Sequence, residues 1–141
     1  MIMKAIKDFI EKNCPCLSDY YEGIGVDYLS EDVTSYSVEA IPTEPIVKTY
    51  LDGSTVRKQD FLFSSRETYG DDVRQNLENL GFYEKFAAWL EECNEKEIFP
   101  DLGEGKEVRK IEALTTGYPY IVDVHEAKYQ IQCSIKYFQE V

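Results

Sequence analysis

The residues best suited to acid–base chemistry are a single histidine and a nearby aspartate. His125 lies in the run DVHEAKY, two residues after Asp123. A histidine that is oriented by a carboxylate can act as a general base in catalysis. The surrounding residues are, however, typical of a turn between two strands, where an exposed histidine is ordinary. We therefore interpret His125 as a turn residue.

The cysteines raise the question of a metal site. The chain has four, Cys14, Cys16, Cys93 and Cys133. Structural zinc sites usually separate paired cysteines by two to four residues and contain a second pair, and neither condition is met here. Cys93 and Cys133 fall on the apolar sides of a predicted helix and a predicted strand. We expect buried free thiols, with no metal, no cofactor and no disulfide required.

Other chemical motifs are weak. Ser64, Ser65 and Ser134 lack the Gly-x-Ser-x-Gly surroundings of a hydrolase nucleophile. The run GEGK at Gly103–Lys106 lacks the spacing of a phosphate-binding loop. The carboxylates form no recognisable catalytic pair. We expect no catalytic residues, so the protein is predicted not to be an enzyme.

Composition and charge exclude several classes of partner. The chain has 141 residues, of which 43% are hydrophobic and 13% aromatic, and this favours a single folded domain over residues 1–141. Its formal net charge of −12 argues against sequence-specific nucleic-acid binding and against binding to anionic membranes. The N-terminal run MIMKAIKDFI has lysines inside it and is not typical of a secretory signal. No apolar run reaches the roughly 18 residues of a membrane-spanning helix.

One segment is basic in this acidic chain. Between residues 46 and 58, Lys48, Arg57 and Lys58 stand against Asp52 alone, which gives a local charge of +2. The pair Asp52-Gly53 separates two extended runs and predicts a β-hairpin with a type I′ turn. That turn would place Lys48 opposite Arg57.

The outer half of this hairpin has no clean apolar face to bury. We therefore expect residues 46–65 to form a protruding arm that contacts a partner. The residues predicted to form the interface are Lys48, Tyr50, Val56, Arg57 and Lys58.

The rest of the chain must position this arm. Apolar spacing predicts a short amphipathic helix over Met3–Asn13 and a longer helical segment over residues 71–95, which Gly81 is expected to kink or split. Strict alternation over Tyr129–Tyr137 predicts a half-buried strand, and the runs GVDYL, SYSVEAI, VRKIEAL and YPYIVDV predict others. The expected fold is α+β, a mostly antiparallel β-sheet with the helices packed on one face.

Two apolar patterns identify the expected core. The longer helix should bury one stripe, formed by Val73, Leu77, Phe82, Phe86, Trp89, Leu90 and Cys93. The alternating strand should bury the other pattern through Ile131, Cys133 and Ile135.

Two long runs carry a resemblance to a known family. They are EPIVKTYLDGSTVRKQDFLFSSRETYGDDVRQNLENLGFYEKFAAWLEE and KEVRKIEALTTGYPYIVDVHEAKYQIQCSIKYF, within residues 32–139. The chain resembles small proteins encoded among the head–tail and tail genes of bacterial prophages. These are minor capsid proteins that are similar to the tail terminators of long-tailed bacteriophages.

The resemblance implies a structural role in a virion. Tail terminators are α+β proteins that close into a homo-oligomeric ring, commonly a hexamer, at the head–tail junction. The ring caps the tail tube and contacts the tail-tube and head-connector proteins. The resemblance places the protein in the virion after its production in the bacterial cytoplasm, and it supplies no catalytic residue.

A ring requires an interface in which two different patches of one subunit meet. A basic arm and an acidic body are such a pair. The alternative from another class is a monomeric protein-binding module that takes its partner on an exposed sheet edge.

Overall fold

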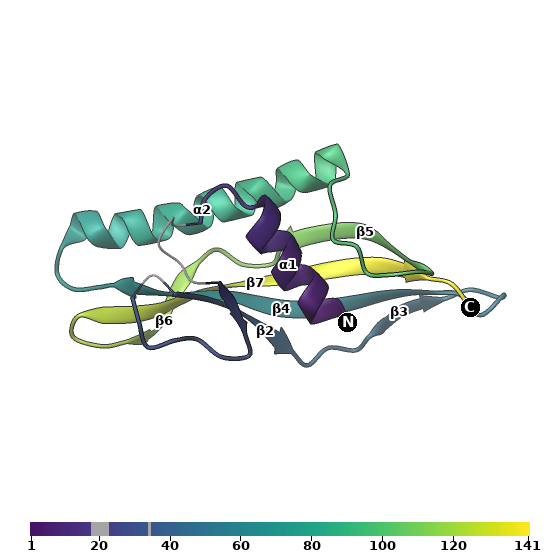
Figure 1. The fold of residues 1–141 in the computed structure, drawn as a ribbon, viewed down its shortest axis with the longest axis horizontal. Helices are drawn as coiled ribbons and strands as arrows, with labels where there is room; N and C mark the ends of the chain where they lie inside the picture. The colour runs from purple at the N-terminus through teal and green to yellow at the C-terminus, as the bar shows by residue number, and fades with distance from the viewer. Residues whose placement is uncertain (18–22, 34) are drawn as a thin grey trace.

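The computed structural model describes residues 1–17, 23–33 and 35–141. These residues form two helices and one seven-stranded, mostly antiparallel sheet (Figure 1). The elements in chain order are α1 (Ile2–Asn13), β1 (Ile24–Val26), β2 (Ser35–Ile41), β3 (Ile46–Thr49), β4 (Thr55–Thr68), α2 (Val73–Lys96), β5 (Lys106–Ala113), β6 (Tyr118–Val122) and β7 (Glu126–Gln139). The predicted α+β fold with a mostly antiparallel sheet is confirmed.

Two long strands form the centre of the sheet. β4 and β7 are antiparallel and pair over their whole length, from Thr55 opposite Gln139 to Thr68 opposite Glu126. β2 and β3 line the outer edge of β4, while β5 and β6 line the outer edge of β7. β1 adds the one parallel pairing, next to β2. Residues 55–65 of the expected arm therefore belong to a central strand, and only β3 and the following turn are left to project.

The core lies between the apolar side of the sheet and the helices. Alternation along β4 and β7 places Phe61, Phe63 and the apolar residues of β7 on one side. Phe63 stacks on Phe86 of α2 with ring centroids 4.4 Å apart, and Phe9 of α1 stacks on Trp89 of α2 at 5.4 Å. Most of the core residues predicted from the sequence are buried, namely Phe86, Trp89, Leu90, Cys93, Ile131, Cys133 and Ile135, and Phe82 is partly buried.

The first half of α2 differs from the prediction. The helix is continuous from Val73 to Lys96, so Gly81 does not split it. Val73 and Leu77 were expected in the core, but they are 69% and 62% exposed. Asn79 and Tyr83 take the buried side instead, because the Asn79 amide donates to the Thr68 carbonyl at 2.8 Å and the Tyr83 hydroxyl donates to the Tyr129 carbonyl at 3.1 Å. Polar anchoring, which an apolar pattern does not reveal, sets the rotation of this half of the helix.

The continuity of α2 gives a testable prediction at Gly81. A Cβ added there would meet no heavy atom within 4 Å. Glycine inside a helix costs about 1 kcal/mol relative to alanine, so Gly81→Ala should raise the free energy of unfolding in urea by about that amount. The matched control is Gly117→Ala, where the added Cβ would lie 2.3 Å from the Cβ of Tyr83 and should destabilise the protein. A Gly81→Ala variant that is less stable than the parent chain would contradict a continuous, outward-facing helix here.

Candidate assembly interface

The hairpin between β3 and β4 has a different turn from the predicted one. The Tyr50 amide donates to the Ser54 carbonyl at 2.8 Å, and the Gly53 amide donates to the Tyr50 carbonyl at 3.0 Å. Gly53 has φ +90°, whereas Asp52 is not among the residues with positive φ. This is a three-residue loop closed by a glycine bulge, and the type I′ prediction was wrong.

Asp52 explains the choice of turn. Its carboxylate accepts from the Ser54 amide at 2.9 Å and from the Ser54 hydroxyl at 2.5 Å. The hydrogen bond from the hydroxyl, and then that from the amide, lower the pKa of Asp52. These hydrogen bonds favour the three-residue loop over a two-residue turn. The longer loop shifts the pairing of β3 with β4 by one residue, so that Lys48 lies opposite Val56 and not opposite Arg57.

The observed register separates the predicted interface residues into two groups. Val56 pairs with Phe138 and Lys58 pairs with Lys136, so these side chains share the sheet face that lies away from Phe61 and Phe63. Lys48 opposite Val56 joins them. Lys136 also pairs with Lys110 of β5, which places three lysines side by side across β4, β7 and β5.

Arg57 is the exception among the five predicted residues. It lies on the opposite face, next to Tyr137, and its Nε donates to the Thr55 hydroxyl at 3.0 Å. Burial raises the pKa of Tyr137, and the positive charge of Arg57 partly offsets that effect. The structure therefore brings together Lys48, Tyr50, Val56 and Lys58, and it removes Arg57 from that group.

Aromatic rings are interleaved with these cations. The rings of Tyr50 and Phe138 lie 6.2 Å apart. The Lys48 Nζ lies 4.9 Å from the Tyr50 ring centroid, and the Arg109 guanidinium lies 5.3 Å from that of Phe138. Cation–π contacts hold both cations on this surface. We call it the basic face, formed by Lys48, Tyr50, Val56, Lys58, Arg109, Lys110, Lys136 and Phe138.

The charges of the basic face are only partly neutralised within the chain. Lys110 pairs with Glu112 at 2.9 Å, and Arg109 lies 3.8 Å from Glu107. Within residues 1–17, 23–33 and 35–141, no carboxylate lies within 4.0 Å of the ammonium groups of Lys48, Lys58 or Lys136. These three cations are available to a partner.

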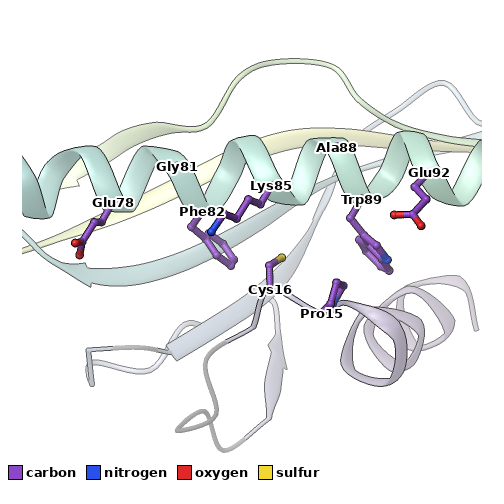
Figure 2. Close-up of a pocket in the computed structure, with 9 residues that line it drawn as sticks. All are labelled: Pro15, Cys16, Glu78, Gly81, Phe82, Lys85, Ala88, Trp89 and Glu92. Carbon is purple, nitrogen blue, oxygen red and sulfur yellow. The ribbon is translucent and has the colours of Figure 1, made fainter.

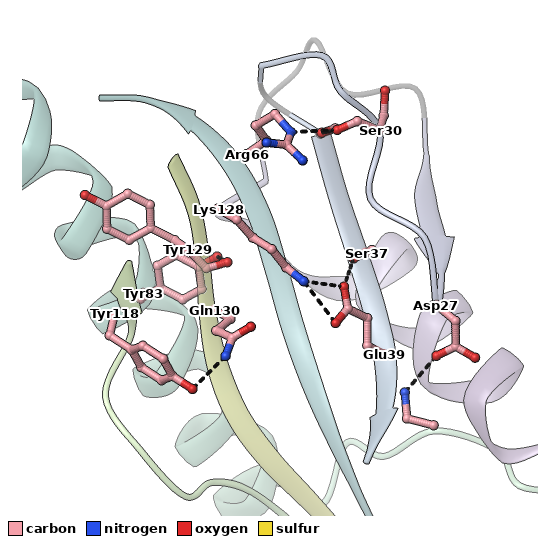
Figure 3. A network of polar contacts seen from close by, with 12 residues as sticks. Asp27, Ser30, Ser37, Glu39, Arg66, Tyr83, Tyr118, Lys128, Tyr129 and Gln130 are labelled. Atoms are coloured by element: carbon pink, nitrogen blue, oxygen red, sulfur yellow. Dashed lines mark hydrogen bonds and ion pairs between the residues drawn. The ribbon is translucent and has the colours of Figure 1, made fainter. Parts of the chain in front are cut away.

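The same sheet face is internally paired further along β7 (Figure 3). Lys128 forms an ion pair with Glu39 at 2.9 Å, and both side chains are largely buried. Arg66 donates to the Ser30 carbonyl at 2.9 Å, and the Gln130 amide donates to the Tyr118 hydroxyl at 2.7 Å. Cations near the other end of β4 and β7 therefore have partners in the chain itself, unlike the three unpaired lysines at the hairpin end.

The acidic counterpart lies on the outer surface of α2. The helix exposes a series of glutamates, namely Glu78, Glu84, Glu91, Glu92 and Glu95. Figure 1 shows that the sheet extends past both helices at the β3–β4 hairpin, where the C-terminus also lies. The basic face and the acidic helix surface are thus different parts of one chain.

A pocket of about 760 Å³ opens between α2 and the segment that follows α1 (Figure 2). Phe82 and Trp89 form its apolar side, Cys16 faces them, and Glu78 and Glu92 lie at its two ends.

Cys16 also contacts a second thiol. The sulfurs of Cys14 and Cys16 lie 2.9 Å apart. Their hydrogen bond lowers the pKa of Cys16, with help from the charge of Lys85, and raises the pKa of Cys14. Cys14, Cys93 and Cys133 are buried free thiols, whereas Cys16 is only partly buried.

The residues considered for catalysis are not assembled into a site. His125 is exposed in the turn between β6 and β7, as predicted. It lines a pocket of about 620 Å³ with Asp71 and Asp72, but Asp72 caps α2 by accepting from the Arg74 amide at 3.0 Å. Asp123 accepts from the Val124 amide at 2.7 Å.

The serines and glycines considered in the sequence lie in the sheet and in a loop, respectively. Ser64, Ser65 and Ser134 are buried in the sheet. Gly103 and Gly105 adopt positive φ in the loop before β5.

The described part of the chain contains no group of three or more His, Cys, Asp or Glu side chains placed to hold a metal ion. None of its helices is long and apolar enough to cross a membrane.

Comparison with known proteins adds no assignment. No protein-family model matches the chain, and no curated protein matches it in sequence.

The sequence missed half of the basic face. Arg109, Lys110, Lys136 and Phe138 were not among the predicted interface residues. Alternation along Tyr129–Tyr137 had placed Lys136 on the solvent-exposed side of its strand, and this pattern could have identified Lys136 as a surface cation. Nothing in the sequence indicated that this strand pairs with β4, so the lysines could not be placed together.

Proposed function

We propose that this protein is a structural component of a bacteriophage or prophage particle, a minor capsid protein that resembles tail terminators. It forms a homo-oligomeric ring at the head–tail junction, caps the tail tube and contacts the head connector. It has no enzymatic activity in this role. The observation that carries the proposal is the basic face, whose Lys48, Lys58 and Lys136 have no acidic partner in the described residues of a chain with net charge −12.

Charge and position together support a ring. Subunits that join through one surface twice form a closed pair, whereas two different surfaces join subunits head to tail and form a ring when the rotation between neighbours closes. The basic face and the glutamates of α2 are two such surfaces, and their opposite charges make them complementary. The resemblance of residues 32–139 to prophage head–tail proteins supports the same assembly and suggests its place in the virion.

Assembly through charged surfaces should depend on salt. Screening shortens the reach of a charge from about 10 Å at 0.1 M salt to about 3 Å at 1 M. We expect sedimentation velocity of the concentrated protein to show a closed oligomer at low salt that dissociates as salt is added. A protein that is monomeric at every salt and protein concentration would contradict the proposal.

One observation favours the alternative, a monomeric protein-binding module. β6 is an edge strand whose Tyr120, Ile121 and Val122 are 61%, 57% and 52% exposed. An apolar edge strand can accept an added strand from a partner. Monomeric sedimentation under all conditions is the result that would favour this function over the ring.

A further inference from the structure

The tip of the β3–β4 hairpin carries an apolar side chain that is not buried within the fold. Leu51 in the turn has a relative exposure of 110%. Turns usually carry polar residues or glycine. The neighbouring Asp52 and Ser54 satisfy each other through hydrogen bonds, so the loop has a defined shape. The turn that carries Leu51 lies at one end of the molecule (Figure 1), and the Leu51 side chain is fully exposed there.

In contrast to the projecting hairpin tip, the pocket beside α2 is a recess lined partly by aromatic side chains. Its side walls include Phe82 and Trp89, and Trp89 is itself anchored by stacking on Phe9 at 5.4 Å. Gly81 in the wall carries no side chain, which leaves the surface of α2 open at that point. Phe82, Ala88 and Trp89 make much of the lining apolar, Lys85 lies between Phe82 and Trp89, and Glu78 and Glu92 lie at the rim (Figure 2).

We propose that the hairpin tip of one copy docks into the α2 pocket of a neighbouring copy, with Leu51 against Phe82 and Trp89. The tip and the pocket lie on different parts of the fold, so the contact joins two chains head to tail. Lys48 and Lys58 on the hairpin then face the glutamates at the rim, which fixes the orientation. This inference rests on the proposed ring and names the contact that builds it.

The first test replaces the apolar tip with a charge. Leu51→Glu removes the burial of one leucine and adds a negative charge among the rim glutamates. Assembly should then need at least about 10- to 100-fold more protein, because burying one leucine contributes that factor. Thermal stability should be unchanged, since the side chain is exposed in the free chain. The matched control is Val124→Glu, another exposed apolar turn residue at 73% exposure, which should assemble normally.

The second test traps the contact itself. Leu51→Cys places a thiol at the tip, and the native Cys16 supplies one in the pocket; Cys14→Ala prevents reaction between neighbours. Mild oxidation with copper phenanthroline should give a ladder of dimers, trimers and larger species on non-reducing gels. Adding Cys16→Ala should abolish the ladder. A pattern that stops at dimers, persists without Cys16 or never forms would overturn the inference.

The two proposals fail in different ways. If the parent chain forms a ring at low salt but Leu51→Glu assembles like Val124→Glu, the docking contact is wrong and the ring stands. If the parent chain is monomeric under all conditions and no ladder forms, both are wrong.

Discussion

Replacing Phe63 by alanine is expected to lower the free energy of unfolding by about 3–5 kcal/mol, as for other fully buried phenylalanines. Phe63 is 0% exposed and lies in β4, at the centre of the sheet. Its ring stacks on Phe86 at 4.4 Å and on Tyr36 at 5.7 Å, so it joins β4 to α2 and to β2. The cavity left by alanine would remove contacts on both sides.

Urea denaturation at equilibrium measures this effect. The control is Tyr120→Ala, an aromatic residue that is 61% exposed on β6 and should change stability by less than about 0.5 kcal/mol. A Phe63→Ala variant with the midpoint of the parent chain would show that the described packing between β4 and α2 is wrong.

The second large effect is expected on assembly. Lys58→Glu combined with Lys136→Glu reverses two cations that lie opposite each other on β4 and β7. Like charges across an interface cost several kcal/mol, so assembly should weaken about 100- to 1,000-fold. Sedimentation equilibrium over a range of protein concentrations measures the change. The isolated chain should keep most of its stability, because surface charges contribute little to it.

The matched control reverses two cations elsewhere. Lys4→Glu with Lys12→Glu changes the net charge by the same amount on α1, and both residues are exposed. It should assemble like the parent chain. If both pairs weaken assembly equally, the effect is one of total charge and the basic face has no special role.

Local patterns were sufficient to predict most of the core. The alternation in β7 and the helical spacing after Phe82 depend on short-range geometry, and the structure buries Ile131, Cys133, Phe86 and Leu90 as those patterns predict. The pairing of β4 with β7 was not predictable. Alternation with a period of two residues indicates which face of a strand is buried, but it does not indicate which strand lies beside it. The β3–β4 hairpin brings Lys48 near Lys58, but Lys136 joins them only through the pairing of β4 with β7.

The turn type of the β3–β4 hairpin was also not predictable from the Asp-Gly pair alone. Asp52-Gly53 is compatible with a two-residue or a three-residue loop. The hydrogen bonds of Asp52 to Ser54 favour the longer one. The resulting shift of one residue moved Lys48 away from Arg57 and left Arg57 on the other face beside Tyr137.

The central claim is that the basic face of one copy binds the acidic α2 surface of the next. The most direct measurement is native mass spectrometry of a chain in which both surfaces are exchanged. It combines Lys58→Glu and Lys136→Glu with Glu78→Lys and Glu92→Lys. Either pair of reversals alone should leave monomers, whereas the chain carrying all four should recover the oligomer of the parent protein. A fourfold variant that stays monomeric while the parent chain assembles, or a single-surface variant that assembles normally, would contradict the claim.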